Sequence, residues 1–405
     1  MNKSPWKTVR LEKVAEIQTG ISKSASRKLT DPIEVPYLRV ANVQDGHLDL
    51  SVIKHISIER KNLERYTLKT GDVLLTEGGD FDKLGRGTVW NNEIESCVHQ
   101  NHVFSVRTDA SVLLPEFLSI LTASSYGKRY FISCSKQSTN LASINSTQLK
   151  QFPVLLPSLD VQKSILSASK LWDNAIEKTE ALIAAKEKQF EWLTQSLISI
   201  RCPNWKHYLA RELFAGVSSK GHPDEELLSV TQDQGVVPRS MLSGRVMSPA
   251  GSTAGYKLVE KGNFVISLRS FQGGLEYSDY RGIVSPAYTV LSPKKKIHSG
   301  FYRHFFKSYI FIEKYLSVAV IGIRDGKQIS STDFDTIKIP YPDMEEQIKI
   351  ALKLDAARQE INLLKDILEK YRCQKRGLMQ KLLTGEWQVG SSQHLSEETY
   401  QEASA

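Results

Sequence analysis

Hydrophobic and polar positions alternate in two different ways along this chain. Residues 1–157 and 203–342 hold short apolar runs separated by Gly, Asn and Asp, a pattern that predicts strands joined by loops. Residues 158–202 and 343–385 instead carry apolar positions at spacings of four and three, which predicts two long helices. The chain is therefore expected to be an α+β protein in which two mixed α/β modules are each followed by a long helix.

The second half of the chain repeats the first at a constant offset, 334 − 149 = 185. Residues 149–165 are LKQFPVLLPSLDVQKSI, and residues 334–350 are FDTIKIPYPDMEEQIKI. At this offset Gln162 aligns with Gln347, and the proline before each helix is also repeated. Each copy is an apolar strand, a proline and a helix start, so the sequence predicts two similar modules in a pseudo-two-fold internal repeat.

Each long helix carries one apolar seam, interrupted by a single lysine, Lys186 or Lys375. Seams of equal length and phase predict that the two helices pack on each other as a coiled coil. Because a globular module joins them, they should run antiparallel. The alternative is that each helix packs only on its own module. The seam residues are Trp172, Ile176, Ile183, Phe190, Leu193 and Leu197 in the first helix, and Ile361, Leu364, Leu368, Tyr371, Leu378 and Leu382 in the second.

The charge distribution favours an anionic partner. The chain has 53 Lys and Arg against 45 Asp and Glu, a formal charge of +8. Residues 386–405 hold four glutamates and no Lys or Arg, so the rest of the chain carries +12. A basic body is typical of proteins that bind nucleic acid, although an ordinary basic surface would give the same number. The acidic tail, 386–405, is expected to be disordered.

The cysteines and the apolar runs argue against several protein classes. Cys97, Cys134, Cys202 and Cys373 are scattered and form no CxxC pair, so we expect reduced thiols and neither a metal site nor a disulfide framework. No apolar run approaches the ~20 residues of a membrane span, and the N-terminal residues lack the apolar core of a signal peptide. A cytoplasmic protein with no membrane contact is predicted.

The motifs of several enzyme classes are missing. The sequence has no GxxxxGK[ST] loop, no HExxH and no GxSxG. Residues 322–327, GIRDGK, are one residue short of a phosphate-binding loop, so a polar loop is the simpler interpretation. Residues 285–288, SPAY, resemble the adenine-binding tetrapeptide of amino-methyltransferases, but Ala287 replaces the second proline and no methyl-donor loop accompanies it. We therefore expect a chain that is not an enzyme and binds no cofactor of its own.

Polar and basic loops are the remaining candidates for function, and they occur after predicted strands in both modules. Arg binds guanine and Asn or Gln binds adenine in the major groove, whereas Lys more often contacts phosphate. Any one loop could be a solvated turn, but equivalent loops in two modules of a basic protein favour DNA binding. The candidate DNA-binding residues are Lys83, Arg86, His99, Gln100, Asn101, Lys136, Gln137, Asn140, Arg269, Arg324, Lys327 and Gln328.

The whole arrangement resembles the specificity subunits of type I restriction–modification systems, up to about Trp387. The resemblance is carried by PYLRVANV at 36–43, GDVLLT at 71–76, the repeated proline–strand–proline segments with the glutamine that follows each, and the ending GLMQKLLTGEW. It implies that 1–157 and 203–342 are target-recognition domains, each binding one half of a bipartite double-stranded DNA sequence. Because the two modules differ outside their shared framework, the two half-sites should differ.

The resemblance also implies roles for the helices and for partner proteins. The spacer helices, 158–202 and 343–385, would form an antiparallel coiled coil that fixes the gap between the half-sites and binds two modification subunits. Those subunits would bring S-adenosylmethionine and methyl transfer, and restriction subunits would bring translocation and cleavage that depend on ATP and Mg. One alternative is a two-headed DNA-binding scaffold or regulator that self-associates through its helices. Another is a fused methyltransferase, which would need a methyl-donor loop.

Overall fold

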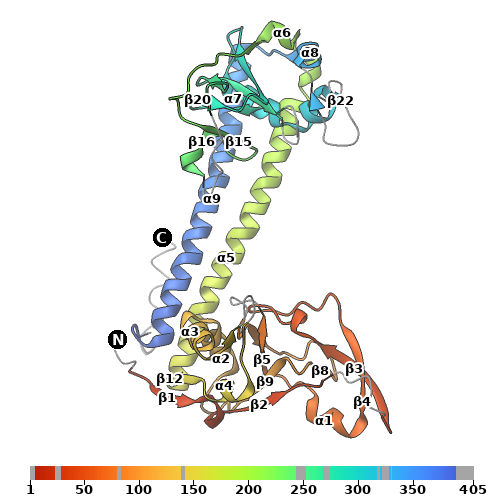
Figure 1. Cartoon of the computed structure of the whole chain (residues 1–405), viewed down its shortest axis with the longest axis vertical. Coiled ribbons are helices and arrows are strands. Elements are labelled where there is room, and N and C mark those ends of the chain that lie inside the picture. The colour runs from red at the N-terminus through yellow and green to blue at the C-terminus, as the bar shows by residue number, and fades with distance from the viewer. Residues whose placement is uncertain are drawn as a thin grey trace, which may run out of the picture. The chain divides into compact units, whose positions relative to one another are not determined.

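Figure 1 shows a computed structural model of the whole chain. Two compact units divide the chain: unit 1 contains Met1–Lys178 and Leu368–Ala405, and unit 2 contains Thr179–Ile367. Each long helix thus contributes to both units. Of the predicted tail, only 386–388 lie within the described residues. The structure describes residues 5–22, 29–79, 84–137, 142–242, 252–267, 274–316, 320–321, 328–329 and 331–388.

A four-stranded antiparallel sheet is the centre of unit 1. Its order is β2-β9-β5-β7, with β2 (Ala15–Thr19), β9 (Val103–Thr108), β5 (Val73–Thr76) and β7 (Gly87–Val89). All four residues of β5 are buried, as expected for a strand covered on both faces. Helices α2 (Pro115–Ala123) and α3 (Ser125–Cys134) complete the core, where the rings of Phe131 and Phe152 stack at 5.2 Å.

A second, three-stranded sheet in unit 1 has the order β4-β3-β8. In it β3 (Pro32–Leu38) pairs antiparallel with β4 (Lys54–Glu59) and parallel with β8 (Val98–His99). The remaining elements are short. They are β1 (Lys7–Arg10) paired with β12 (Pro153–Leu156), the sheet of β10 (Lys136–Gln137), β11 (Ala142–Ser143) and β6 (Gly78–Gly79), the helices α1 (Leu63–Tyr66) and α4 (Ser146–Lys150), and the 3-10 turns η1 (Leu11–Lys13), η2 (Val40–Asn42) and η3 (Arg60–Asn62).

Unit 2 repeats the central sheet of unit 1. Its order is β14-β21-β18-β19, with β14 (Phe214–Val217), β21 (Tyr288–Pro293), β18 (Phe264–Ser267) and β19 (Glu276–Tyr277). Helix α7 (Ser299–Lys307) takes the place of α2 and is followed by the π-helix η8 (Phe311–Leu316). The core is aromatic: Phe306 lies 4.8 Å from Phe311, edge to face. Burying each such ring contributes roughly 1.5–3 kcal/mol.

The smaller elements of unit 2 are two-stranded antiparallel pairs, two short helices and 3-10 turns. They are β13 (His207–Leu209) with β24 (Lys338–Pro340), β15 (Leu228–Thr231) with β16 (Gly235–Pro238), β17 (Lys257–Val259) with β20 (Gly282–Val284), β22 (Val320–Ile321) with β23 (Gln328–Ile329), the helices α6 (Ala210–Leu213) and α8 (Ser331–Asp335), and the 3-10 turns η6 (Cys202–Asn204) and η7 (Arg239–Met241). The pair β13–β24 corresponds to β1–β12 of unit 1, so both modules begin and end on the same two-stranded element.

The two repeated glutamines join each long helix to its module. Gln162 is fully buried; its Oε1 accepts from Leu114 N at 2.9 Å, and its Nε2 donates to Val112 O and Pro157 O. Gln347 is also fully buried; its Oε1 accepts from His298 N at 2.8 Å and its Nε2 donates to Pro342 O. Leu114 and His298 are the N-cap residues of α2 and α7. The same amide therefore fixes the same junction in both units.

The two long helices are α5 (Leu159–Thr194), which continues as the π-turn η5 (Gln195–Ser199), and α9 (Met344–Thr384). Helix α9 ends where Gly385 adopts a φ of +74°, a backbone conformation that favours glycine. At its start, Asp343 Oδ1 accepts from Glu346 N at 2.8 Å. The Glu346 carboxylate in turn accepts from Trp205 Nε1 at 2.9 Å, which ties the helix to the segment that opens the second module.

Contacts within each unit show that α5 and α9 pair antiparallel. In unit 1 the Trp172 and Tyr371 rings meet edge to face at 5.7 Å, and Lys375 forms an ion pair with Asp173. In unit 2, Lys186 Nζ lies 2.7 Å from Glu360 Oε1, and the Arg358 guanidinium covers the Phe190 ring at 3.9 Å. From the Lys186–Glu360 contact to the Phe190–Arg358 contact, residue numbers rise along α5 and fall along α9. Both seam lysines therefore meet a carboxylate of the opposite helix.

The seam positions are buried or half-buried, and the ends of the seams also enter the module cores. Ile183, Leu197, Ile361, Leu368 and Leu382 are at most 8% exposed. Phe190, Leu193 and Leu197 pack in the aromatic core of unit 2, whereas Leu378 and Leu382 pack in the core of unit 1. The helices thus contact each other along their lengths and the modules at their ends, which combines the two arrangements considered from the sequence.

Candidate nucleic-acid interface

A tight turn in unit 1 carries two of the predicted DNA-binding residues, Gln100 and Asn101. It joins β8 to β9 and is closed by a hydrogen bond from Val103 N to Gln100 O at 2.9 Å. Its backbone is held from both sides, by Gln100 N to Leu38 O at 2.8 Å and by Asn101 N to Ile21 O at 3.2 Å. Gly20 allows the approach of the neighbouring segment, because a Cβ there would lie 2.0 Å from His99 O. The turn is therefore a rigid platform.

Polar and cationic side chains surround this turn and line an open cleft of about 350 Å³. Arg39 and Lys54 bring positive charge from the end of β3 and the start of β4, and Tyr37 donates from its hydroxyl to Ile21 O at 2.9 Å. Burial raises the pKa of Tyr37, so its hydroxyl stays protonated at neutral pH. The described lining consists of Ser22, Tyr37, Arg39, Lys54, Gln100, Asn101 and His102.

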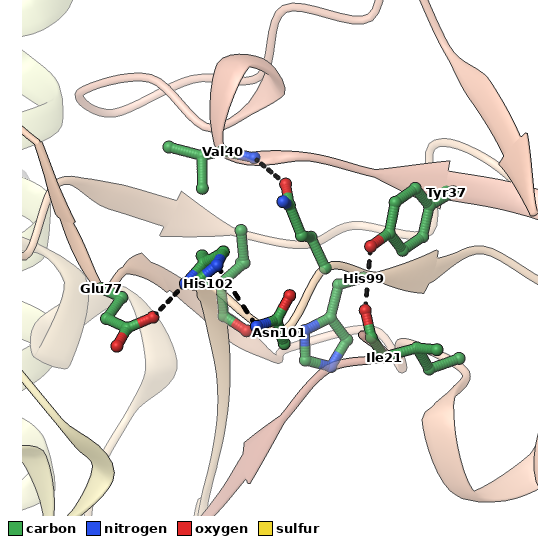
Figure 2. A network of polar contacts seen from close by, with 9 residues as sticks. Ile21, Tyr37, Val40, Glu77, His99, Asn101 and His102 are labelled. Atoms are coloured by element: carbon green, nitrogen blue, oxygen red, sulfur yellow. Dashed lines mark hydrogen bonds and ion pairs between the residues drawn. The ribbon is translucent and has the colours of Figure 1, made fainter. Parts of the chain in front are cut away.

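The amides of the cleft are held in defined orientations, as Figure 2 shows. Gln100 Oε1 accepts from Val40 N at 3.3 Å. Asn101 Nδ2 lies 3.3 Å from His102 Nε2, and the other ring nitrogen, Nδ1, contacts the Glu77 carboxylate. Amides and cations held in a cleft match the hydrogen-bonding edges of bases and the phosphates of a nucleic acid.

His99, another predicted DNA-binding residue, belongs to the protein interior. Its side chain is 1% exposed, and its Nδ1 donates to Val103 O at 2.8 Å. Burial lowers the pKa of His99, so the ring is neutral. A side chain without solvent access has no path to a base edge, and we therefore leave His99 out of the proposed DNA surface. Its structural role is to hold the strand that follows the turn.

The other described residues predicted for the first module, Arg86, Lys136 and Gln137, lie in or beside other strands. Arg86 is half-buried just before β7; its carbonyl accepts from Thr76 N at 2.9 Å, and its Nε is buried with no hydrogen-bond partner among the described residues. Lys136 is exposed in β10. Gln137 follows it in that strand, where only its backbone is described. Lys83 and Asn140 lie outside the described residues.

The equivalent turn of unit 2 has different side chains. It joins β20 to β21 and is closed in the same way, by Tyr288 N to Ser285 O at 3.0 Å. Ser285, Pro286 and Ala287 therefore take the places of Gln100, Asn101 and His102. Of the residues predicted for this module, Arg269, Arg324 and Lys327 lie outside the described residues, and only the backbone of Gln328, in β23, is described.

Unit 2 has a larger cleft, about 730 Å³, between the module and the helices. Several of its basic side chains contact acids of the same unit: Lys307 contacts Glu276, Arg303 Nη2 lies 3.2 Å from Asp279 Oδ2, and His304 Nε2 lies 2.8 Å from Asp355 Oδ1. The hydrogen bond from His304 is the largest cause that lowers the pKa of the Asp355 carboxyl. Because neighbouring acids offset these positive charges, the cleft suits a fixed junction between the module and the helices better than a surface that binds a polyanion such as DNA.

Sequence reasoning missed Tyr37, Arg39 and Lys54 as cleft residues. Tyr37 and Arg39 belong to the PYLRVANV run, where their alternation with apolar residues indicated only a strand. Arg39 is held by a hydrogen bond from its Nη2 to Val52 O at 3.3 Å, and its Nε is buried with no hydrogen-bond partner in the described part of the chain. A charged residue at the end of a buried strand was the one available signal.

Comparisons with known proteins agree over most of the chain. Residues 3–186 and 249–370 match the family model described as "Type I restriction modification DNA specificity domain". The putative type I restriction enzyme MjaX specificity subunit of Methanocaldococcus jannaschii is 23% identical over 422 aligned residues, covering 95% of this chain and 94% of that protein. The EcoKI specificity subunit of Escherichia coli is 25% identical over 166 residues, covering 40% of this chain and 35% of that one.

Solved structures share the fold. The HsdS subunit from Thermoanaerobacter tengcongensis matches with a TM-score of 0.57 at 16% identity, over 96% of this chain and 100% of that one. A chain from a study of complex assembly and conformational transition of the type I R-M system matches with a TM-score of 0.65, also at 16% identity, over 96% and 100%. In the described part of the chain, no helix has the length and apolar character needed to cross a membrane.

Proposed function

The chain belongs to the family of DNA specificity subunits of type I restriction–modification systems, and from this premise we propose that its two modules bind two different half-sites. Members of this family recognise DNA and are not catalytic. The observation that carries the proposal is the difference between the two equivalent turns. The turn in unit 1 presents Gln100, Asn101 and His102, whereas the turn in unit 2 presents Ser285, Pro286 and Ala287.

The chemistry of the unit 1 cleft supports direct contact with DNA. Asn101 and Gln100 supply amide donors and acceptors for base edges, and Arg39 matches the two acceptors of guanine. Lys54 is exposed at the start of β4 and suits a phosphate, a contact that positions the protein without sequence information. Among the residues predicted from the sequence, Gln100 and Asn101 keep their proposed role, and Arg39 and Lys54 join them; Arg86 and Lys136 are not part of the described cleft lining.

The helices supply the proposed spacer and docking surface. The antiparallel pairing of α5 and α9 gives a firm element on which two modification subunits would bind, and restriction subunits would join that complex. The alternative, a regulator that self-associates through its helices, would need the same seams. Within each unit those seams already contact the other helix of the same chain, as the Trp172–Tyr371 and Lys186–Glu360 contacts show. This favours the intramolecular spacer.

The test is to map the methylated sequence with and without this chain. Full-length chain is combined with its modification subunits, S-adenosylmethionine and a library of DNA, and modified adenines are located by sequencing. We expect no methyl transfer by the chain alone, and methylation at a split, asymmetric sequence by the complex. A symmetric or continuous site, or the same site without this chain, would contradict the proposal.

Two variants then test the cleft. Arg39→Ala should relax preference at one base pair by roughly 1–3 kcal/mol. Lys54→Ala should weaken binding to all sequences alike and reduce its salt dependence by about one phosphate contact. Lys61→Ala, which removes an exposed cation of η3 outside the cleft lining, is the matched control.

A further inference from the structure

A relay of three side chains, Glu77, His102 and Asn101, lies at the edge of the unit 1 cleft (Figure 2). Glu77 lies between β5 and β6, and its backbone is fixed twice: its N donates to His102 O at 2.9 Å, and its O accepts from Ile144 N at 2.8 Å. Both ends of the Glu77–His102 contact therefore sit on hydrogen-bonded backbone. The relay is anchored to the central sheet and does not depend on a free loop.

The chemistry of the relay sets the orientation of Asn101. An ionised carboxylate can only accept, so His102 Nδ1 must donate to Glu77. In the neutral ring the other nitrogen, Nε2, then carries a lone pair. It accepts from Asn101 Nδ2 at 3.3 Å, because Nδ2 can only donate. The second N–H of Asn101 and its Oδ1 have no partner among the described residues and remain for a ligand in the cleft.

We propose that Asn101, oriented by Glu77 and His102, binds an adenine of the half-site recognised by unit 1. This inference rests on the proposed function and names one base within it. In the major groove adenine presents a donor, N6, beside an acceptor, N7, and an amide matches both. Guanine presents two acceptors there, so Oδ1 of the oriented amide would face O6 without a proton between them. Asn101 touches the base; His102 and Glu77 are positioning residues.

The rest of the cleft and the second unit sharpen the inference. Gln100 already uses its Oε1 to accept from Val40 N, so it offers Nε2 donors more readily than a donor–acceptor pair. In unit 2 the places of Asn101 and His102 are taken by Pro286 and Ala287, which have no polar side chain. The relay is therefore a property of one module, and its loss should affect one half-site.

The experiment measures base preference at every position of the recognised sequence, with the complex of full-length chain and modification subunits. Competing DNAs carry each of the four base pairs at each position. The variants are Asn101→Ala, His102→Ala, Glu77→Ala and Glu77→Gln, with Asn91→Ala, an exposed residue outside the cleft lining, as control. Thermal unfolding and the wild-type preference at the other half-site show whether each variant is folded.

We expect Asn101→Ala to lose roughly 5- to 150-fold of discrimination for A·T at one base pair of one half-site. His102→Ala and Glu77→Ala should relax preference at that same base pair. Glu77→Gln should restore most of it, since its amide oxygen can still accept from His102. A uniform loss at all positions, an effect at a G·C pair, or no change on Asn101→Ala would overturn the relay. Absence of any sequence preference in the wild-type complex would instead refute the proposed function.

Discussion

The repeated buried glutamines allow the strongest test of how the fold is held together. Replacing Gln162 by Met keeps the approximate side-chain volume but removes three hydrogen bonds, to Leu114 N, Val112 O and Pro157 O. The same change at Gln347 removes two, to His298 N and Pro342 O. At about 1 kcal/mol for each buried hydrogen bond lost, we expect a destabilisation of about 3 kcal/mol in unit 1 and about 2 kcal/mol in unit 2.

Native-state hydrogen exchange is the appropriate assay, because a chain of two units need not unfold in one step. Gln162→Met should speed amide exchange in α2 and leave α7 unchanged, and Gln347→Met should do the opposite. Gln189→Met, an exposed glutamine of α5, is the control and should change neither. If Gln162→Met stays within about 0.5 kcal/mol of that control, or if each variant affects both helices equally, the glutamines do not fix these junctions.

Three further predictions concern pH, the seam and the spacer. Burial lowers the pKa of His99, so the stability linked to its neutral ring is present above about pH 6.5 and is lost as the pH falls through the folded pKa. The loss is at most about 1.4 kcal/mol per pH unit. In thermal unfolding measured between pH 7.5 and 5, His99→Asn should remove this contribution to the pH dependence. Lys186→Leu should raise the opening free energy of α5, measured by amide exchange, by about 1 kcal/mol, because the lost ion pair is partly exposed and the seam gains an apolar side chain. The control Lys188→Leu, at an exposed position of the same helix, should leave that free energy unchanged. Seven residues can be inserted after Ala185 and seven after Glu360, because the Lys186–Glu360 contact shows that these two points lie opposite each other, and a seven-residue insertion keeps the seam in phase. The mapped spacer should widen by roughly 10 Å, about three base pairs. An unchanged spacer in an active variant would show that the helices do not set the spacer length.

The features that the sequence could predict are those encoded by periodicity and repetition. Two long helices followed from apolar positions at spacings of four and three, their pairing from two seams in equal phase, and their antiparallel direction from the module that joins them. Gln162 and Gln347 could be recognised as equivalent because the residues around them also repeat. Their function could not be inferred in this way, because the partners, Leu114 and His298, lie almost fifty positions away and are not alike in sequence.

The cleft depended on information that local pattern does not contain. Arg39 and Lys54 reach the turn at Gln100 only because β3 pairs parallel with β8 and antiparallel with β4. His99 belongs to a polar run, HQNH, that looks uniform in sequence, yet it is the last residue of β8 and its side chain faces the interior, whereas the three that follow form the turn. A one-residue difference in position along a strand decides between core and surface.

The two turns show how one framework could serve the two different half-sites proposed above. Each is closed by a backbone hydrogen bond, Val103 N to Gln100 O in unit 1 and Tyr288 N to Ser285 O in unit 2. The side chains of the turn carry none of these bonds, so they can differ without disturbing the sheet that follows. The buried glutamine and the two-stranded element that begins and ends each module are repeated, because they hold the module to the helices. The fold thus separates the residues that must be alike in both units from those free to specify a base, and we expect substitutions in the turn to change sequence preference at little cost in stability.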